Sequence, residues 1–311
     1  MNETDKKIFA CIDVGGTKTE ALLFTGDGTV LDHFFEPGGT VIDLGFDEAS
    51  DRYVRTAERL KKAAGGYLDH FYASIAAYDY TRGALDEDFR RKVDGIGKIR
   101  LEGDGPCLIS AILGHNDGAS MICGTGSSLC VRKGNEYHHI GGYGFLFDSC
   151  GSGYVLGRDA VRAVLRAHDG RRQPTVMAEL IEKKCGESAF DHLDKFYYGG
   201  RAYIASMASV VFEARKMGDP VAERIFNTGA RELAELAFAA TGELGNEYRL
   251  ILNGGIFANY PEYARAVSAL CPEGVTTVTS DLPPIMGAAA EALFDGGVDY
   301  FSVKEKLRSG L

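Results

Sequence analysis

One arrangement of short apolar segments occurs twice along the chain, first over residues 8–35 and again over residues 119–140. In each copy, turns separate three such segments and the first turn is rich in glycine, which is typical of a meander of three β-strands. The two copies agree in architecture but hardly in residue identity. The economical inference is a fold built from two related halves, with an interdomain cleft that receives both glycine-rich turns.

Helical spacing of apolar residues dominates the rest of the chain. The segments with this spacing, or with helix start and stop signals, are 46–64, 106–113, 157–168, 202–217, 220–244, 262–270 and 284–294. Between residues 89 and 99 the pattern indicates a helix or a helix followed by a strand. Because 311 residues exceed the usual size of one hydrophobic core, we predict an N-terminal domain over 1–114 and a C-terminal domain over 115–311. The last helix of the second domain could pack back on the first.

Charge and cysteine usage exclude several classes of protein. The net charge of −10 disfavours a broad nucleic-acid or anionic-membrane surface. No apolar run approaches the ~20 residues that span a bilayer, and the polar N-terminus lacks the layout of a signal peptide. The seven cysteines are scattered without a C-x-x-C motif, which indicates reduced thiols rather than disulfides or zinc ligands. We therefore expect a cytoplasmic protein with no nucleic-acid or membrane partner.

The first glycine-rich turn, DVGGTKT, follows a strand that ends at Asp13. Glycine lets backbone N–H groups approach a phosphate, threonine hydroxyls donate hydrogen bonds, and lysine supplies positive charge. The residues predicted to contact phosphate here are Gly15, Gly16, Thr17, Lys18 and Thr19. Asp13 is the predicted Mg²⁺ residue, acting through water. A plain hairpin turn beside an acid is the alternative for this motif taken alone.

The second glycine-rich turn offers similar contacts through Gly124, Thr125, Gly126 and Ser127. Its matching position in the second half favours a shared phosphate-binding role over two ordinary turns. Asp117 stands shortly before it, ahead of the strand that leads into the turn. A carboxylate facing the cleft can take the proton from a sugar hydroxyl that attacks the γ-phosphate. We therefore predict Asp117 as the general base, with a capping or turn role as the alternative.

Weaker signals come from three other kinds of motif. The glycines at 254–255 follow a buried strand and would let a flat base lie against the backbone, while the helix that opens at 283–289 could close the other side. Plain packing is the alternative for each. His138 and His139 are adjacent on a strand and point to opposite faces, which indicates a strand surface rather than a metal site. The acidic runs at 86–88 and 102–104 are expected to be solvated loops.

Taken in order, these stretches resemble the BadF/BadG/BcrA/BcrD-type ATPase family, which includes N-acetylglucosamine kinase and belongs to the ASKHA superfamily of actin-like and hexokinase-like ATPases. The resemblance covers essentially the whole chain and is most specific at Asp13–Thr19, Asn116–Ala119, Gly124–Ser127, Gly141–Gly144, Gly151–Gly157 and Leu252–Phe257. It implies an α/β fold of duplicated ribonuclease-H-like domains that closes over ATP, Mg²⁺ and a sugar, and it implies a homodimer. The ROK sugar kinases are similar through D-x-G-G-T-K and the N-D pair, but their E-x-G-H segment and Cys-rich zinc loop are missing here.

The resemblance also implies roles for individual residues. Asp117 falls on the family's catalytic base, and the two glycine-rich turns fall on its two phosphate loops. Gly254, Gly255 and Gly287 fall on the adenosine site. The positions expected to contact the sugar are Thr40, Ala77, Asn116, Ser128, Gly142, Tyr143, Asp148 and Ser149.

The acceptor side departs from the family's pattern. Where its amino-sugar kinases usually read G-D-E-G-S-G-Y, this chain reads D-S-C-G-S-G-Y over residues 148–154, so Ser149 and Cys150 replace an Asp and a Glu. Ala77 adds a methyl group at a strand end where the family usually has glycine, and the run 38–43 has no asparagine. The nucleotide side is intact while the acceptor side is altered.

We therefore expect an ATP-dependent sugar kinase, a phosphotransferase that moves the γ-phosphate to a hydroxyl of an amino sugar resembling N-acetylglucosamine. Two alternatives come from other classes. One is an ATPase that activates a partner enzyme, as the family's activators with a cysteine-bound iron–sulfur cluster do, although Cys123, Cys130 and Cys150 fit no obvious cluster spacing. The other is a catalytically altered sugar or nucleotide sensor, motivated by the loop at 148–150.

Overall fold

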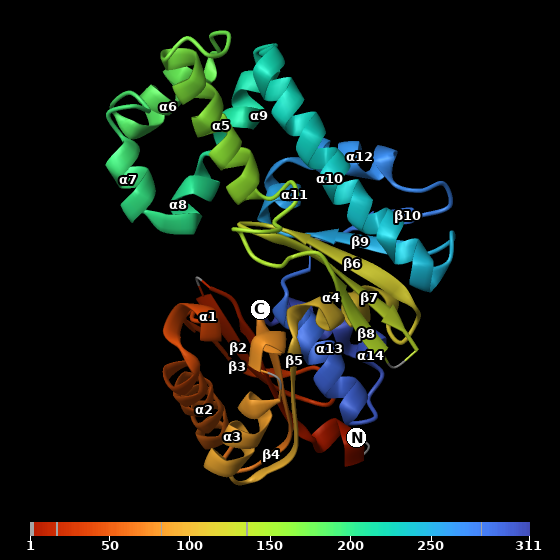
Figure 1. The fold of residues 1–311 in the computed structure, drawn as a ribbon. Helices are drawn as coiled ribbons and strands as arrows, with labels where there is room; N and C mark the ends of the chain where they lie inside the picture. The colour runs from red at the N-terminus through yellow and green to blue at the C-terminus, as the bar shows by residue number, and fades with distance from the viewer. Residues whose placement is uncertain (1–2, 17, 82, 135, 281) are drawn as a thin grey trace. The chain divides into compact units, whose positions relative to one another are not determined.

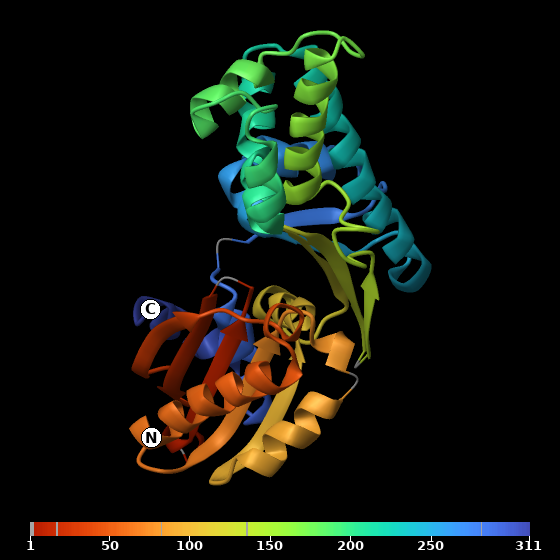
Figure 2. The same cartoon turned by 60° about the vertical axis from the view of Figure 1, so that its left-hand side comes forward.

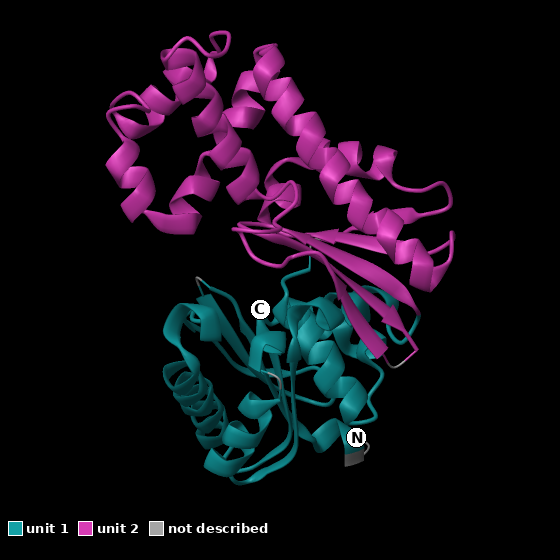
Figure 3. Cartoon of the chain, in the orientation of Figure 1, with its two compact units in different colours: residues 1–116, 282–311 teal, residues 117–281 magenta. Residues whose placement is uncertain are grey.

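The computed structural model describes residues 3–16, 18–81, 83–134, 136–280 and 282–311. The chain forms two compact units (Figure 3): residues 1–116 with 282–311, and residues 117–281. The predicted division is 1–114 and 115–311, with the last helix able to pack back on the first domain; in the structure residues 282–311 belong to the first unit. There the small side chains of α13 (Ile285–Asp295) let this helix pack closely against both α4 and β1.

The first unit is a five-stranded sheet in the order β3-β2-β1-β4-β5, covered by helices on both faces (Figure 1, Figure 2). Its strands are β1 (Ile8–Val14), β2 (Lys18–Thr25), β3 (Val30–Pro37), β4 (Leu68–Ile75) and β5 (Ile96–Gly103). Its helices are η1 (Glu3–Lys6), α1 (Val41–Leu44), α2 (Phe46–Ala63), η2 (Tyr78–Thr81), α3 (Ala84–Lys92), α4 (Asp104–Leu113), α13 and α14 (Tyr300–Ser309). One apolar core joins the sheet to α2 and α3, and a second joins it to α4, α13 and α14.

The second unit repeats the sheet in the order β8-β7-β6-β9-β10 and adds a larger set of helices. Its strands are β6 (Gly118–Cys123), β7 (Ser127–Lys133), β8 (Glu136–Ile140), β9 (Arg249–Asn253) and β10 (Thr276–Thr279). Its helices are α5 (Gly153–His168), α6 (Met177–Cys185), α7 (Leu193–Tyr198), α8 (Gly200–Ser206), α9 (Ala208–Lys216), α10 (Pro220–Leu244), α11 (Gly255–Asn259) and α12 (Pro261–Leu270). One core joins β6, β7 and β9 to these helices.

The two sheets match strand for strand, which confirms the predicted α/β fold of two related halves. In each, an antiparallel meander of three strands is followed by two strands parallel to the first. The carboxyl ends of the parallel strands therefore meet at one edge of each sheet, which is where open α/β sheets bind ligands.

Most predicted helices are present, but one is divided. The segment 202–217 forms α8 and α9, with the break at Met207. A Cβ added at Gly157 of α5 would lie 2.0 Å from the carbonyl oxygen of Ile204, so the backbones of α5 and α8 are in direct contact there. Over 84–103 the structure has α3 followed by β5, the second of the two forms that the pattern indicated.

Asp219 fixes the start of α10, and its removal gives the first testable prediction. Its carboxylate accepts hydrogen bonds from the N–H groups of Val221 and Ala222, both at 2.8 Å, and from Thr175 Oγ1 and the N–H of Val176, both at 2.9 Å. Burial alone raises the pKa of Asp219, but these hydrogen bonds outweigh it and leave the pKa below its ordinary value. We expect Asp219→Ala to lower the free energy of unfolding by about 2–4 kcal/mol at neutral pH.

The same carboxylate makes a pH-dependent contribution that urea unfolding measures. A carboxyl group with a lowered folded-state pKa stabilises the protein fully above its unfolded-state pKa of about 4. That contribution is lost as the pH falls through the folded-state value. The difference between the wild type and Asp219→Ala should therefore shrink below about pH 4; a deficit that stays constant down to the lowest pH at which the protein is folded would contradict this account.

Two observations bear on the class of protein. All seven cysteines are free thiols, four of them buried and three partly buried. Among the described residues, no helix has both the length and the apolar character needed to cross a membrane.

Candidate active site

Asp13 lies at the carboxyl edge of the first sheet. It pairs in register with Ser74 of β4, whose hydroxyl donates to Asp13 Oδ1 at 2.8 Å. Enclosure within the protein raises the pKa of Asp13 to about 7; the Ser74 hydrogen bond opposes this shift and the nearby Asp104 carboxylate adds to it. A cation would stabilise the ionised form of such a carboxylate. Asp13 therefore fits a Mg²⁺ that keeps most of its ligands as water, since the described residues contain no group of three or more metal-ligating side chains.

The first glycine turn follows Asp13 and has the features of a phosphate loop. The N–H of Gly15 donates to the Lys18 carbonyl at 2.9 Å, which closes the turn. Lys18 extends to Glu20 at 3.0 Å. Thr19 Oγ1 is buried and has no hydrogen-bond partner among the described residues, so one donor at the end of the loop is unused. Thr17, which was also predicted to bind phosphate, lies outside the described residues.

A carboxylate that the motif analysis missed stands at this same edge. Asp104 follows β5 directly and opens α4, and the last residue of β5, Gly103, pairs in register with Ile75 of β4. Its charge acts on Asp13, so the two carboxylates belong to one site.

The expectation that 102–104 is a solvated loop is therefore wrong. Glu102 belongs to β5, accepts a hydrogen bond from Tyr72 Oη at 2.8 Å, and has a pKa raised by burial. The sequence signal that could have indicated Asp104 is an acid directly after a strand. The parallel pairing of that strand with β4 then places the acid at the ligand edge.

Asp117, the predicted general base, lies at the opposite edge of its own sheet from the glycine loop. It precedes β6, whereas Gly124–Ser127 follows β6, and the six-residue strand separates the two by roughly 17–20 Å. Its carboxylate accepts the N–H of Gly134, in the turn between β7 and β8, at 2.7 Å. The structure thus supports the alternative role, in which Asp117 fastens a hairpin. Its neighbour Asn116 donates to the Leu113 carbonyl at 2.8 Å at the end of α4, the end remote from Asp104.

Thr40 and Ala77, expected to contact the sugar, do lie beside the first glycine turn. The N–H of Gly39 donates to the Gly15 carbonyl at 3.1 Å, and Thr40 Oγ1 donates to Asp43 Oδ2 at 2.8 Å. A Cβ on Gly16 would lie 3.3 Å from that same Asp43 oxygen. Ala77 follows β4 with φ at 65°, a left-handed conformation that alanine rarely adopts. Asp43 is a second carboxylate near this edge that the motif analysis did not select.

The second glycine turn lines a pocket of about 310 Å³ within the second unit. Gly124, Thr125 and Gly255 face it, together with small residues of α8 and α9 and with Asn259 and Tyr260. The N–H of Gly153, at the start of α5, donates to the Gly124 carbonyl at 2.8 Å and fixes the loop. This pocket brings the predicted second phosphate loop and part of the predicted adenosine site together.

The other two glycines assigned to adenosine lie in different units, and each permits a close approach of two backbones. Gly254 has φ at 111°, and a Cβ there would lie 2.4 Å from the Cys123 carbonyl oxygen. The close approach of these two backbones shapes the wall behind Gly255. Gly287 lies in α13 of the first unit, where a Cβ would lie 2.5 Å from the Cys107 carbonyl oxygen of α4. Close packing of α13 against α4 accounts for Gly287 within the first unit.

The segment between β8 and α5 holds four of the remaining sugar-contact predictions, and the fifth, Ser128, lies in β7. Ser127 Oγ donates to the Cys150 carbonyl at 2.6 Å, and Ser149 Oγ and Ser152 Oγ are 2.8 Å apart. Asp148 Oδ1 accepts a hydrogen bond from Cys150 Sγ at 2.8 Å. A Cβ on Gly142 would lie 2.6 Å from the Ser128 Cβ, and Tyr143 is exposed. The segment is thus tied to the second glycine turn, and its one carboxylate, Asp148, contacts its own neighbour.

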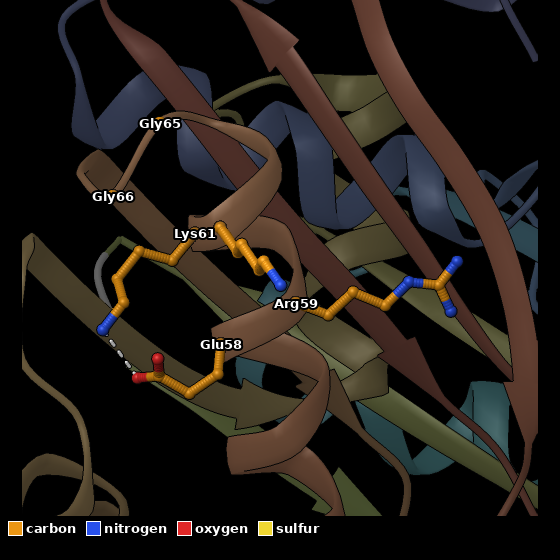
Figure 4. Close-up of a pocket in the computed structure, with 6 residues that line it drawn as sticks. Glu58, Arg59, Lys61, Gly65 and Gly66 are labelled. Atoms are coloured by element: carbon orange, nitrogen blue, oxygen red, sulfur yellow. Dashed lines mark hydrogen bonds and ion pairs between the residues drawn. The ribbon is translucent and has the colours of Figure 1, made fainter.

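A hollow at the C-terminal end of α2 is a poor candidate for a site (Figure 4). Its walls are Glu58, Arg59, Lys61, Lys62, Gly65 and Gly66. It stands at the amino end of β4, away from Asp13. Lys61 is paired with Glu58 at 2.7 Å and with Asp94 at 2.8 Å, so its charge is already satisfied.

Solved structures share this fold. A candidate N-acetylglucosamine kinase from Chromobacterium violaceum superposes with a TM-score of 0.72 at 20% identity, covering 93% of this chain and 99% of that one. A ROK family glucokinase from Streptomyces griseus, in complex with glucose and AMPPNP, gives a TM-score of 0.58 at 19% identity, covering 92% and 98%.

Curated sequences extend the likeness. An N-acetylmuramic acid/N-acetylglucosamine kinase from Clostridium acetobutylicum is 27% identical over 84% of this chain and 90% of its own length. A glucosamine kinase from Vibrio cholerae is 27% identical over 79% of this chain and 83% of its own length. The model of the BadF/BadG/BcrA/BcrD ATPase family matches residues 11–292. With most of its length matched, this chain belongs to the BadF/BadG/BcrA/BcrD ATPase family.

Proposed function

We propose that this protein is an ATP-dependent kinase that transfers the γ-phosphate of ATP to a hydroxyl of an amino sugar, with Asp104 as the general base. The observation that carries the assignment of the base is the position of Asp104 directly after β5, at the same sheet edge as Asp13. The curated relatives named above act on N-acetylmuramic acid, N-acetylglucosamine and glucosamine, which supports an amino-sugar acceptor.

Each group of residues then has a separate task. Asp104 accepts the proton of the attacking hydroxyl, a role that needs an ionised carboxylate within hydrogen-bond reach of that proton. The glycine turns at Gly15 and Gly124 bind phosphate oxygens through backbone N–H groups. The pocket beside Gly255 holds the adenosine. Asp13 would hold Mg²⁺, and the ion, when bound, would neutralise the charge that develops on the phosphoryl group.

The residues of the second unit that are expected to contact the sugar include few carboxylates. Ser149 and Cys150 supply a hydroxyl and a thiol where the family usually has an Asp and a Glu, and Asp148 contacts Cys150. A hydrogen-bonding site discriminates between sugars because a sugar that lacks the matching group leaves a polar group of the protein unpaired. We propose that Thr40, Asp43 and Asp104 of the first unit supply the main polar contacts to the acceptor.

We also propose that the protein is a cytoplasmic homodimer. Seven free thiols agree with a reducing compartment. Tyr197 and Tyr198 at the end of α7 are 82% and 90% exposed, and such tyrosines are enriched at protein interfaces. Light scattering on the purified protein, with a Tyr197→Ser/Tyr198→Ser variant beside it, measures the assembly.

The test of the activity is a coupled assay of ADP release over a sugar panel. The panel compares glucosamine, N-acetylglucosamine and N-acetylmuramic acid with glucose, each with ATP and Mg²⁺. We expect at least one amino sugar to exceed glucose in kcat/KM by about tenfold or more, the ratio of one well-used polar contact. A panel in which no sugar stimulates ADP release would contradict the kinase and would favour the sensor or the activator.

A further inference from the structure

A column of arginines runs along one face of α5, away from the site described above. Arg158, Arg162 and Arg166 recur every four residues, and this spacing places them one above another on a helix. The opposite face of α5 carries the core residues Leu156 and Ala160. The arginine face therefore takes no part in this apolar core.

Two of these arginines line a pocket of about 240 Å³ that two other segments complete. Arg162 and Arg166 come from α5, Arg172 from the connection to α6, and Arg224 from α10. Val221 and Ile225 of α10 add an apolar part to the lining. Four arginines thus line one small hollow in a chain whose net charge is −10.

The pocket's own carboxylate does not balance this charge. Asp159 accepts hydrogen bonds from Arg158 Nε at 2.9 Å and from Arg162 Nη1 at 3.1 Å, so two arginines already share its charge. Among the described residues, no carboxylate lies within ion-pair distance of Arg166, Arg172 or Arg224. Like charges gathered without a counter-ion repel one another, so the arrangement favours an anion.

The walls of the pocket are held in place without a ligand. The N–H of Arg172 donates to the Arg166 carbonyl at 2.9 Å, which fixes the connection against the end of α5. Asp219 joins that connection to α10 through Thr175 and Val176, as described above. The hollow in Figure 4 differs, because Glu58 and Asp94 already pair its Lys61.

We propose that this arginine pocket binds the phosphate group of a small phosphorylated molecule, at a site separate from the nucleotide pocket. The guanidinium fork matches phosphate oxygens in pairs, and its charge stays fixed at any physiological pH. A volume of about 240 Å³ lies below that of pockets for drug-sized ligands and suits a phosphate with a short apolar or polyhydroxyl body. Val221 and Ile225 contact that body.

Isothermal titration calorimetry on the full chain tests the site. The protein is first saturated with a non-hydrolysable ATP analogue and Mg²⁺, so that the phosphate loops are filled. Inorganic phosphate, an amino-sugar phosphate and the unphosphorylated sugar are then titrated separately. We expect both phosphates to bind. The affinity should fall at least about tenfold in Arg166→Gln/Arg224→Gln, because each of the two substitutions removes charge-assisted hydrogen bonds.

Arg171→Gln is the matched control. Arg171 lies next to the pocket but pairs with Asp169 at 2.5 Å, so its loss removes a charge without removing a pocket contact and should leave affinity within about twofold. If the double variant fails to fold, the exposed Arg224→Gln alone carries the comparison, with thermal melting as the folding check.

The separate titrations distinguish the sources of the phosphate. Tighter binding of the amino-sugar phosphate than of inorganic phosphate identifies a sugar phosphate, and equal binding identifies phosphate alone; both support the site. Absence of binding in the wild type, or equal affinity in the double variant, overturns it. A loss of self-association in the double variant, seen by sedimentation without any change in phosphate affinity, would instead make this face a contact between copies of the chain.

Discussion

Replacing Asp104 with asparagine should lower kcat for the amino sugar by about 10²–10⁴-fold, the usual contribution of a positioned general base. The amide matches the carboxylate in size but cannot accept the proton of the attacking hydroxyl. Because Asp104 lies in the first turn of α4, the substitution also removes a favourable charge at a helix N-terminus, which costs only about 0.3–1 kcal/mol of stability. The variant should therefore fold normally and bind ATP normally while losing turnover.

The measurement is kcat and KM for both substrates, with Asp117→Asn as the matched control. The two aspartates are close in the sequence and both are followed by glycine, but Asp117 accepts the N–H of Gly134 at the other edge of its sheet. Asparagine can still accept that hydrogen bond through its side-chain oxygen. We expect turnover of Asp117→Asn to stay within about threefold of the wild type, since no transition-state contact is lost. Loss of turnover in Asp117→Asn with normal turnover in Asp104→Asn would restore the base predicted from the motif.

The proposal of Asp104 in place of Asp117 as the base shows what local sequence could and could not indicate. Glycine turns between short apolar segments predicted both meanders correctly, because neighbouring strands in a meander pair through local contacts. Which acid stands at the ligand edge depends on strand direction, and β5 acquires its direction by pairing with β4, more than twenty positions earlier in the chain. Asp117 precedes the strand that leads into its glycine turn, which the sequence already shows, whereas the position of Asp104 becomes clear only from the pairing of β5 with β4.

Glycine posed a related difficulty. Gly254 and Gly287 both lie in segments that resemble the family's adenosine site. In the structure, Gly254 meets Cys123 beside the pocket, and Gly287 meets Cys107 where two helices pack. A glycine that lets a strand approach beside a pocket and a glycine that lets a helix approach look alike in one sequence. The return of residues 282–311 to the first unit, which sets the surroundings of Gly287, is a long-range contact with no local signal.

Gly254→Ala should weaken the binding of ATP, because Gly254 stands directly behind the wall of the second unit's pocket. The backbone of Gly254 has φ at 111°, and the added Cβ would lie 2.4 Å from the Cys123 carbonyl oxygen and 2.7 Å from its carbon. Neither atom belongs to a flexible side chain, so β6 and the start of α11 must separate. Together the unfavourable φ and the overpacking should cost about 2–5 kcal/mol of stability. The separation would also displace Gly255 and Gly124, raising KM for ATP by about tenfold or more if a shift near 1 Å follows.

Stability loss alone could mimic a loss of binding, and Gly274→Ala separates the two. Gly274 also has a positive φ, 95°, and its added Cβ would lie 2.8 Å from the Asn246 carbonyl oxygen, but it precedes β10 and does not line the pocket. Both variants should lower the melting temperature, whereas only Gly254→Ala should raise KM for ATP, with KM for the sugar less affected. An equal rise in KM for ATP in both variants would mean that a general loss of stability in the unit weakens nucleotide binding. A normal KM in Gly254→Ala would mean that the pocket tolerates the separation of β6 from α11, and the adenosine would then have to depend on Asn259 and Tyr260 instead.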